Sequence, residues 1–195
     1  MKVISPTLFW VHLTHCDKQF DEFMEDLNEY MDRRKDKFLI MPKYLNEGDV
    51  VATRTNKGWQ RAVLIKFNKD NTVQLMLRDW GAFIRHPKYG LYRLPDHFFT
   101  ENWHAIPCGL AYAKPATQGL LWPHRVRTLL KGLTENREGS FQILKPIREE
   151  GALVRLTIVQ QRGVIAQDVL QDLMHLGVVQ RASTPAVVVY PTVNM

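Results

Sequence analysis

The segment from residue 48 to residue 94 alternates short apolar runs with tight turns, and no other feature of the chain restricts its fold as strongly. Runs rich in β-branched and aromatic residues lie at 49–54, 59–67, 72–80 and 82–86. They are separated by TNKG, by NKDN and by a single glycine, and such residues favour the turns of β-hairpins. Short strands joined by turns of this kind predict a small antiparallel barrel.

The sequence before this segment predicts a buried strand and then a long helix. The run at 8–13 follows Pro6 and is rich in aromatic and branched residues, which favours a strand. Further on, apolar residues recur at steps of three and four, the pattern of an amphipathic helix of roughly four turns. These residues are Phe20, Phe23, Met24, Leu27, Tyr30 and Met31. We expect Asp17 to cap the start of this helix, and the basic sequence RRKDK complements the dipole at its end.

The sequence after residue 99 predicts further strands and two helices. Strands are expected at 104–113, 140–147 and 152–159, and helices at 123–130 and 166–177, the second stopped by Gly177. Together with the elements before the barrel, they predict a second β-rich unit with helices. The tail at 183–195 has no charged residue and two prolines, so it is either a loose end or an added strand.

Composition restricts the class of protein. The 195 residues are 45% hydrophobic and 24% charged, enough for one good core or two small ones. No run of about 18 apolar residues and no secretory signal pattern is present, so we expect no membrane partner. Two cysteines are too few for a disulfide framework, and free thiols favour a cytosolic or nuclear location. The net charge of +6 permits a polyanionic partner, but basic and acidic residues are mixed along the chain and solubility explains them equally.

Metal and catalytic sites are not indicated by the sequence pattern. The stretches HLTHC and WHAIPC supply zinc-ligand types at His12, His15, Cys16, His104 and Cys108, but with no recognised spacing. The pattern shows no clustered carboxylates with an arginine, no Gly-rich phosphate loop and no nucleophile–base pair. We therefore predict no metal, no cofactor and no enzymatic activity.

Seven short motifs relate the chain to a known family. They are SPTLFWVHL, GDVVA, GWQRAVL, LRDWGA, YRLPDHF, AIPCGLA and DVLQDLMHLGVVQRAS, in this order. Together they resemble the extended Tudor domain of germline proteins of the piRNA pathway, over nearly the whole chain. The resemblance implies a mainly β fold with helices (α+β). In this fold a Tudor barrel is inserted into an oligonucleotide-binding-like (OB-like) β-barrel similar to staphylococcal nuclease (SN-like), and a long helix joins the two.

The resemblance also implies where the parts of the chain begin and end. Residues 1–45 would form the first part of the SN-like unit with its linker helix, and residues 46–99 the Tudor barrel core. Residues 100–182 would form the second part of the SN-like unit, and residues 183–195 the C-terminal tail.

Members of this family bind arginine-rich peptides of Piwi-type Argonautes and hold a symmetrically dimethylated arginine in a cage of aromatic rings with an asparagine. Methylation makes the guanidinium wider and less hydrated, so ring faces attract it by cation–π and apolar contact. By motif, the cage positions fall on Gln60, Leu77, Trp80 and Ala82, and the remaining one on Thr53 or Arg54. Only Trp80 is aromatic. The resemblance therefore implies a barrel that has kept its scaffold and lost its cage.

Other motif positions indicate scaffold roles. Arg61 and Asp79 stand at the family's Arg and Asp positions, where an ion pair between neighbouring strands would brace the barrel. We expect Gly81 in a turn, and Phe83 facing away from the cage because strand side chains alternate. Trp80 either covers the mouth of the barrel or contacts a ligand.

The leading hypothesis is a non-catalytic module that binds an extended arginine-containing peptide. The peptide would be the N-terminal segment of a Piwi-type Argonaute, bound independently of methylation in the cleft between barrel and flanking unit. We expect the peptide to contact the former cage positions, residues next to them and the acidic face of the helix. These residues are Trp80, Gln60, Leu77, Ala82, Arg54, Asp79, Glu22, Glu25 and Glu29. The alternative for the acidic face is an ordinary solvated surface. The resemblance also implies a cytoplasmic location in perinuclear germ granules (nuage).

Two alternatives stay open. One is binding of single-stranded RNA on the OB-like unit through exposed aromatic and basic residues, namely Trp103 or Trp122 with Lys114, Arg125, Arg127 and Lys131. The other is scaffolding by self-association through the apolar tail.

Overall fold

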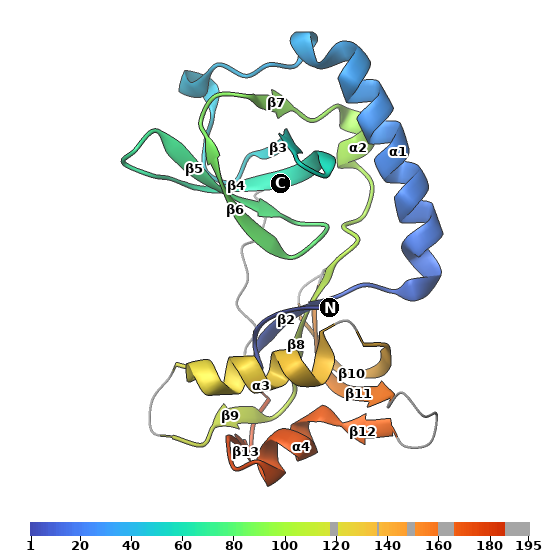
Figure 1. Ribbon diagram of the computed structural model, residues 1–195, viewed down its shortest axis with the longest axis vertical. Helices are drawn as coiled ribbons and strands as arrows, with labels where there is room; N and C mark the ends of the chain where they lie inside the picture. Colours follow the sequence, from blue (N-terminus) through green and yellow to red (C-terminus); the bar gives the residue numbers. More distant parts are fainter. Residues whose placement is uncertain (118–120, 136, 148–150, 160–165, 186–195) are drawn as a thin grey trace. The chain divides into compact units, whose positions relative to one another are not determined.

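The computed structural model describes residues 1–117, 121–135, 137–147, 151–159 and 166–185 of the chain (Figure 1). They divide into two compact units. The barrel unit is formed by residues 12–105, and the flanking unit by residues 1–11 together with the described residues from 106 to 185. The boundaries between the two units therefore lie after residues 11 and 105. The resemblance implies boundaries after residues 45 and 99, and it assigns the long helix to the flanking unit.

The barrel unit is built on a five-stranded antiparallel sheet. Its strands are β3 (Val50–Thr55), β4 (Gly58–Phe67), β5 (Thr72–Leu77), β6 (Ala82–Pro87) and β7 (Leu91–Arg93), in the order β6-β5-β4-β3-β7. The predicted runs form strands, and β7 completes the sheet where the sequence predicts no separate strand. The sheet is strongly curved (Figure 1). Alternate residues on its inner face form a buried core: Val51, Ala62, Leu64, Val73, Leu75, Leu77 and Leu91.

Helix α1 (Asp17–Arg34) is present as predicted but has 18 residues, about one turn more than the four turns expected, and it buries Phe20, Leu27 and Met31. The prediction that Asp17 caps it is wrong. The N-cap is Cys16, and no side chain makes a capping hydrogen bond there. The 3₁₀ turn η1 (Thr14–Cys16) leads directly into the helix, so the Asp17 N–H is satisfied by the Thr14 carbonyl and Asp17 becomes the first helical residue.

Two polar residues of α1 fix it to the β3–β4 hairpin. The Asn28 Oδ1 accepts the Trp59 backbone N–H at 2.8 Å, and the Asp32 Oδ1 accepts the Trp59 indole N–H at 2.8 Å. Gly58 allows this approach, because its φ is +94° and a Cβ there would lie 2.3 Å from the Asn28 Oδ1. The unit also contains η2 (Lys35–Lys37), η3 (Pro42–Tyr44) and the short helix α2 (Asp96–Phe99).

The flanking unit combines two sheets with two helices. Strands β1 (Lys2–Ser5), β2 (Leu8–Val11), β8 (Ile106–Leu110), β11 (Gly151–Val159) and β10 (Gly139–Ile147) are neighbours in this order, and β12 (Ala166–Asp168) also pairs with β11. The β8–β11 pair is parallel and the other pairs are antiparallel. Strands β9 (Ala113–Pro115) and β13 (Val179–Arg181) form a second, two-stranded sheet. Helices α3 (His124–Thr134) and α4 (Val169–His175) contribute Val126, Leu130, Val169 and Leu173 to the core.

Two predicted elements of this unit are divided in the structure. The predicted strand at 104–113 is interrupted at Ala111 and Tyr112, between β8 and β9. The predicted helix at 166–177 begins only after Asp168, because residues 166–168 pair with β11 and the Asp168 carboxylate accepts the N–H groups of Leu170 and Gln171. The last helical residue is His175, and Gly177 follows with a φ of +67°.

Across the described part of the chain, strands outnumber helices, as predicted for a mainly β fold with helices. No helix within these residues is long and apolar enough to cross a membrane. The tail from residue 186 onward lies outside the described residues, so the prediction of an added strand or a loose end stays a prediction.

Candidate functional site

The inner face of the barrel sheet brings together most of the predicted pocket residues at one end. Thr53 pairs with Gln60 across β3 and β4, and Leu77 pairs with both Ala62 and Ala82 across β5 and its neighbours. Thr53, Gln60 and Leu77 are buried there, and Ala82 packs against the same core. This end of the sheet is the candidate pocket.

The structure decides between the two candidates for the remaining position. Thr53 is fully buried on the inner face, and its hydroxyl has no hydrogen-bond partner among the described residues. Arg54, one residue further, lies on the outer face because strand side chains alternate. It is more than half exposed and forms an ion pair with Asp32 of α1 at 3.2 Å. Thr53 therefore belongs to the pocket, and Arg54 does not.

Trp80 is held in place by contacts on several sides. Its indole N–H donates to the Oε1 of Gln60 at 2.5 Å, and Gln60 is only 2% exposed. Phe20 and His12 meet the ring edge to face, with centroids 5.4 and 5.8 Å away. The Nζ of Lys57 lies 5.5 Å from the ring centroid. The one aromatic ring of the pocket is thus packed against α1, bonded to Gln60 and already close to a cation.

The predicted ion pair of Arg61 and Asp79 is confirmed as a buried brace. Both side chains are 1% exposed, and the guanidinium donates to both carboxylate oxygens, from Nε at 2.9 Å and from Nη2 at 2.6 Å. The remaining Arg61 donors reach the backbone carbonyls of Phe98, Glu101 and Asn102 at 2.8 to 3.0 Å. Asp79 is thus beneath the surface, and it stabilises the barrel rather than lining the pocket.

The brace is covered by groups that motif reasoning did not identify. The Arg61 guanidinium lies 4.5 Å from the ring centroids of both Phe23 and Trp103. Arg78, also buried, donates to the carbonyl of Ala105 at 3.0 Å, and its guanidinium lies 5.7 Å from the Trp103 ring centroid. The sequence signal for this second buried arginine was the position of Arg78 directly before Asp79 in the motif LRDW.

His12 and His104 form a half-buried pair next to Trp80. Their ring centroids are 4.5 Å apart, and Phe20 stacks on His104 at 3.9 Å. Burial, together with the nearby His104, lowers the pKa of His12 to about 4. Burial also lowers the pKa of His104, although Asp17, whose Oδ1 is 3.4 Å from the His104 Nε2, opposes this shift. Both rings are therefore neutral at pH 7.

The zinc-ligand types named from the sequence do not gather into a metal centre within the described residues. Cys108 is fully buried in the core of the flanking unit, and burial raises the pKa of its thiol to about 12. A neutral thiol in an apolar core is a packing group.

The acidic residues Glu22, Glu25 and Glu29 lie along the exposed face of α1, opposite the buried Phe20, Leu27 and Met31. Glu22 pairs with Lys18 at 3.6 Å, and Glu29 pairs with Arg33. Glu25 has no ion pair in the described part of the chain. The structure thus places these carboxylates on a solvated helix face and not at the pocket around Trp80.

The residues named for RNA binding are only partly placed as expected. Lys114, Arg125, Arg127 and Lys131 are exposed. Trp103 and Trp122, predicted to be exposed, are half-buried: Trp103 lies beside the two buried arginines, and the Trp122 indole N–H donates to the Thr7 hydroxyl at 2.9 Å. Phe83 is partly exposed, in agreement with a side chain facing away from the pocket, and Gly81 has a φ of +62° in a turn.

Comparison with known proteins gives matches of two kinds. A family model described as Tudor domain matches residues 1–112 of this chain. No curated protein sequence matches it. Solved structures of several relatives match at low identity and high structural similarity.

The human TDRD1 extended Tudor domain, solved in complex with a symmetrically dimethylated peptide, shares 20% identity at a TM-score of 0.77, covering 92% of this chain and 86% of that one. The mouse TDRD1 extended Tudor domain TD3, solved with a MILI peptide containing dimethylarginine, shares 15% identity at a TM-score of 0.79, covering 93% and 90%. The Drosophila melanogaster Papi extended Tudor domain shares 19% identity at a TM-score of 0.79, covering 92% and 95%. A variant of the Papi domain was also solved with an unmethylated Piwi N-terminal peptide. At these identities the solved structures establish similarity of fold.

Proposed function

Because this chain belongs to the Tudor domain family and has the fold of an extended Tudor domain, we propose that it is a non-catalytic module that binds an extended arginine-containing peptide without selecting methylated arginine. Its partner is the N-terminal segment of a Piwi-type Argonaute. The observation that carries the proposal is the hydrogen bond from the Trp80 indole N–H to the buried Gln60, at the positions where the family places its cage.

Selection of dimethylarginine requires several ring faces around one guanidinium. A single exposed ring contributes about 0.5–1 kcal/mol to cation binding. Here Trp80 is the one aromatic side chain among the pocket residues, and the others are Thr53, Gln60, Leu77 and Ala82. Two added methyl groups would find little ring surface to contact, so the methylated and unmethylated forms would bind almost equally.

The position of Lys57 adds a second argument against a methylarginine cage. The Lys57 ammonium group lies 5.5 Å from the Trp80 ring centroid. In an aromatic cage, the ligand's guanidinium would contact this ring. An incoming guanidinium would have to displace this charge or bind beside it, and like charges repel. The pocket therefore favours ligand contact at its rim over capture of a cation inside it.

The solved complexes of relatives support a peptide as the ligand. They include a dimethylated MILI peptide on mouse TDRD1 and an unmethylated Piwi N-terminal peptide on a Papi variant. The same fold is thus compatible with both methylation states. The proposal extends to location: binding of such a partner would bring the protein to cytoplasmic, perinuclear germ granules, which imaging of a tagged chain can test.

A titration tests the proposal directly. One Piwi N-terminal peptide is prepared in three forms: unmethylated, symmetrically dimethylated at one arginine, and with that arginine replaced by alanine. Fluorescence anisotropy with the full 195-residue chain should give dissociation constants for the first two forms that agree within about threefold, and weaker binding of the alanine form. A tenfold or greater preference for the dimethylated form would contradict the proposal.

A variant shows whether the pocket is the place of binding. Trp80→Ala should weaken peptide binding if the ligand contacts this rim, and Phe83→Ala, which removes a partly exposed ring on the opposite face, serves as the matched control. Equal binding by wild type and Trp80→Ala would place the peptide elsewhere on the molecule.

A further inference from the structure

The positive charge of this protein is concentrated in the flanking unit. The described residues of that unit carry nine Lys and Arg side chains against four Asp and Glu, whereas the barrel unit carries fifteen against fourteen. Almost all of the net charge of +6 is therefore located outside the barrel unit. Such an asymmetry between two units of one chain favours a polyanionic partner for the basic unit.

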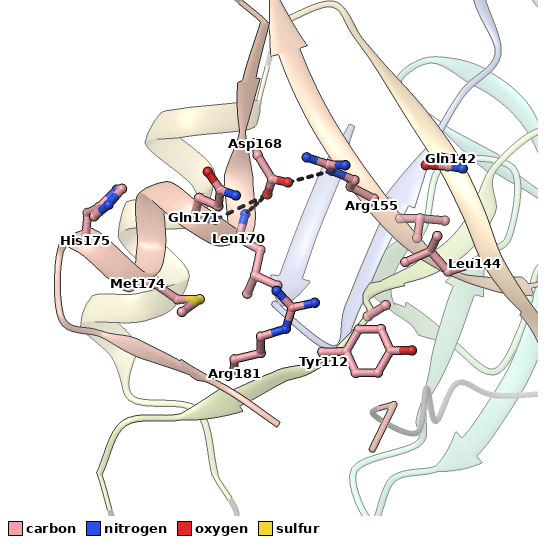
Figure 2. A pocket seen from close by; sticks show the side chains of 12 residues that line it. Tyr112, Gln142, Leu144, Arg155, Asp168, Leu170, Gln171, Met174, His175 and Arg181 are labelled. Atoms are coloured by element: carbon pink, nitrogen blue, oxygen red, sulfur yellow. Dashed lines mark hydrogen bonds and ion pairs between the residues drawn. The ribbon is translucent and has the colours of Figure 1, made fainter. Parts of the chain in front are cut away.

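The flanking unit also contains a hollow of about 770 Å³, within the size range of ligand sites. It is bounded by β10, β11, α4, the end of β13 and the turn before β9 (Figure 2). Its apolar lining comes from Ala111, Leu144, Val154, Leu170 and Met174, and its polar lining from Tyr112, Gln142, Arg155, Asp168, Gln171, His175 and Arg181.

Tyr112, at the edge of this hollow, has an unusual backbone. Its φ is +64°, a left-handed conformation that bulky side chains rarely adopt. The strain is maintained by its surroundings, because the Tyr112 carbonyl accepts the Ala182 N–H at 2.7 Å and the following residue pairs with Arg181 in the β9–β13 sheet. A strained residue whose ring lines a cavity is an indication of a binding role.

Two arginines bring positive charge to the hollow against one carboxylate. Arg155 donates from its Nε to Asp168 at 2.7 Å, and the other Asp168 oxygen caps α4. That bond uses one of the five donors of the Arg155 guanidinium, and its side chain is more than half exposed. The Arg181 guanidinium lies 5.6 Å from the Tyr112 ring centroid. Figure 2 shows these two side chains near each other. The hollow thus offers cationic donors beside an aromatic ring.

We propose that this hollow is a binding site for single-stranded nucleic acid. A base would lie against the Tyr112 ring and the apolar wall, where aromatic stacking tolerates any base. The side-chain amides of Gln142 and Gln171 can each donate to and accept from a base edge. Arg155 and Arg181 would contact the phosphates, and the exposed basic residues Arg125, Arg127 and Lys131 of α3 add to the attraction of the unit for a polyanion.

An acidic peptide is the competing occupant, and the lining favours nucleic acid over it. A peptide carboxylate would use the two arginines in the same way. It would leave the ring and the two amides without the flat, hydrogen-bonding partner that a base supplies. The experiment below separates the two.

Binding is measured by anisotropy of a short labelled oligouridine RNA with the full chain, at two or more salt concentrations, and is repeated with the matching oligothymidine DNA. We expect binding at low salt that weakens as salt rises, by about 0.7 in the logarithmic slope for each phosphate contact. Equal affinity for the two strands indicates recognition of single strands in general, and tighter binding of the RNA indicates contacts to its 2′-hydroxyls.

Charge variants test where the strand binds. Arg181→Gln and Arg155→Gln should each weaken binding about three- to tenfold and reduce the salt slope, because each removes a phosphate contact. Lys69→Gln removes one exposed charge from a turn of the barrel unit and should leave the affinity within twofold of wild type. Arg155→Gln removes the ion-pair partner of Asp168, the N-cap residue of α4. Circular dichroism melts therefore verify that this variant remains folded.

Ring variants test the role of Tyr112. Asn tolerates the left-handed backbone, so Tyr112→Asn removes the ring without added strain and should weaken binding about tenfold. Tyr112→Phe keeps the ring and should bind within twofold of wild type.

Three results would overturn the proposal: no binding at low salt, equal losses in the Arg181→Gln and Lys69→Gln variants, or competition by a polyglutamate peptide as effective as competition by unlabelled oligouridine. None of them bears on peptide binding at the barrel, which is measured with a separate probe and variants.

Discussion

The barrel unit and the flanking unit of this protein differ in where they can accept a ligand. In the barrel unit, the pocket position named by the sequence motifs has its one aromatic ring, Trp80, hydrogen-bonded to the buried Gln60. In the flanking unit, which carries no recognised binding motif, a hollow of about 770 Å³ is open and lined by cations beside a ring. A motif position indicates where a site is expected, but the side chains around that position decide which ligand groups it can contact.

The two units also differ in their balance of acidic and basic residues. Acidic and basic residues nearly balance in the barrel unit, and its arginines are largely engaged, as in the pairs Arg61–Asp79 and Arg54–Asp32. The flanking unit has an excess of basic residues, most of them exposed. We therefore expect salt to affect ligands of the flanking unit more strongly than ligands of the barrel pocket.

The largest effect is expected from removing the buried ion pair of Arg61 and Asp79 in the barrel unit. Asp79→Ala leaves the Arg61 guanidinium buried without its counter-charge, so the free energy of unfolding should fall by about 3–5 kcal/mol. Urea denaturation followed by tryptophan fluorescence measures this. Lys18→Ala, which breaks an exposed ion pair on α1, is the control and should change stability by less than about 0.5 kcal/mol. Similar effects of the two changes would mean that the brace is not a main determinant of barrel stability.

A pair of glycines, one in each unit, gives the next largest difference. Gly58→Ala forces a side chain into a φ of +94° and against Asn28, so stability should fall by about 2 kcal/mol. Gly132→Ala, in the flanking-unit helix α3 with nothing within 4 Å of the added Cβ, should raise stability by about 0.4–1 kcal/mol. Thermal melts of both variants measure the opposite signs, and a loss in both would contradict the structural account of Gly132.

Rebuilding the cage should make the barrel pocket selective for dimethylarginine. The triple change Gln60→Tyr, Leu77→Phe and Ala82→Asn removes the side chain that holds Trp80 and adds two rings with an amide. Each ring contributes about 0.5–1 kcal/mol, so a preference for dimethylarginine of roughly tenfold is expected in the peptide titration. Thr53, which stays in the remaining position, limits the gain. Unchanged selectivity in a folded triple variant would show that cage residues are not what removes methylation dependence.

A further prediction concerns pH, and it sharpens the comparison because the responsible group lies in the barrel unit. Burial lowers the pKa of His12 to about 4 in the folded state, against an ordinary value of 6.5. The unfolded chain therefore binds more protons between these values, so stability should decrease as pH falls from about 6.5 towards 4. His12→Gln should reduce this pH dependence, whereas His124→Gln, on the exposed face of α3, should leave it unchanged.

Local patterns of the sequence were sufficient for most elements of the fold. The spacing of Phe20, Leu27 and Met31 predicted α1, and the alternation between turns predicted the strands of the barrel sheet. The start of α4 was not predictable in this way. A helical period is visible from residue 166, but pairing with β11 takes residues 166–168 into the sheet, and that competition depends on a distant partner.

The candidate site was likewise predictable from the sequence only in part. The identity of the pocket residues, and the single aromatic among them, followed from motif positions in the sequence. The choice between Thr53 and Arg54 required the strand register. The contacts of Trp80 with Phe20, Lys57 and Gln60 could be seen only in the structure. The sequence by itself determined most of the elements and the pair of residues in the brace, because those depend on local period and on motif spacing. Only the tertiary structure decided which side chains surround Trp80, where the flanking unit has a hollow and which unit carries the charge, because these depend on residues far apart in the chain, such as 1–11 and those from 106 onward, joining into one unit.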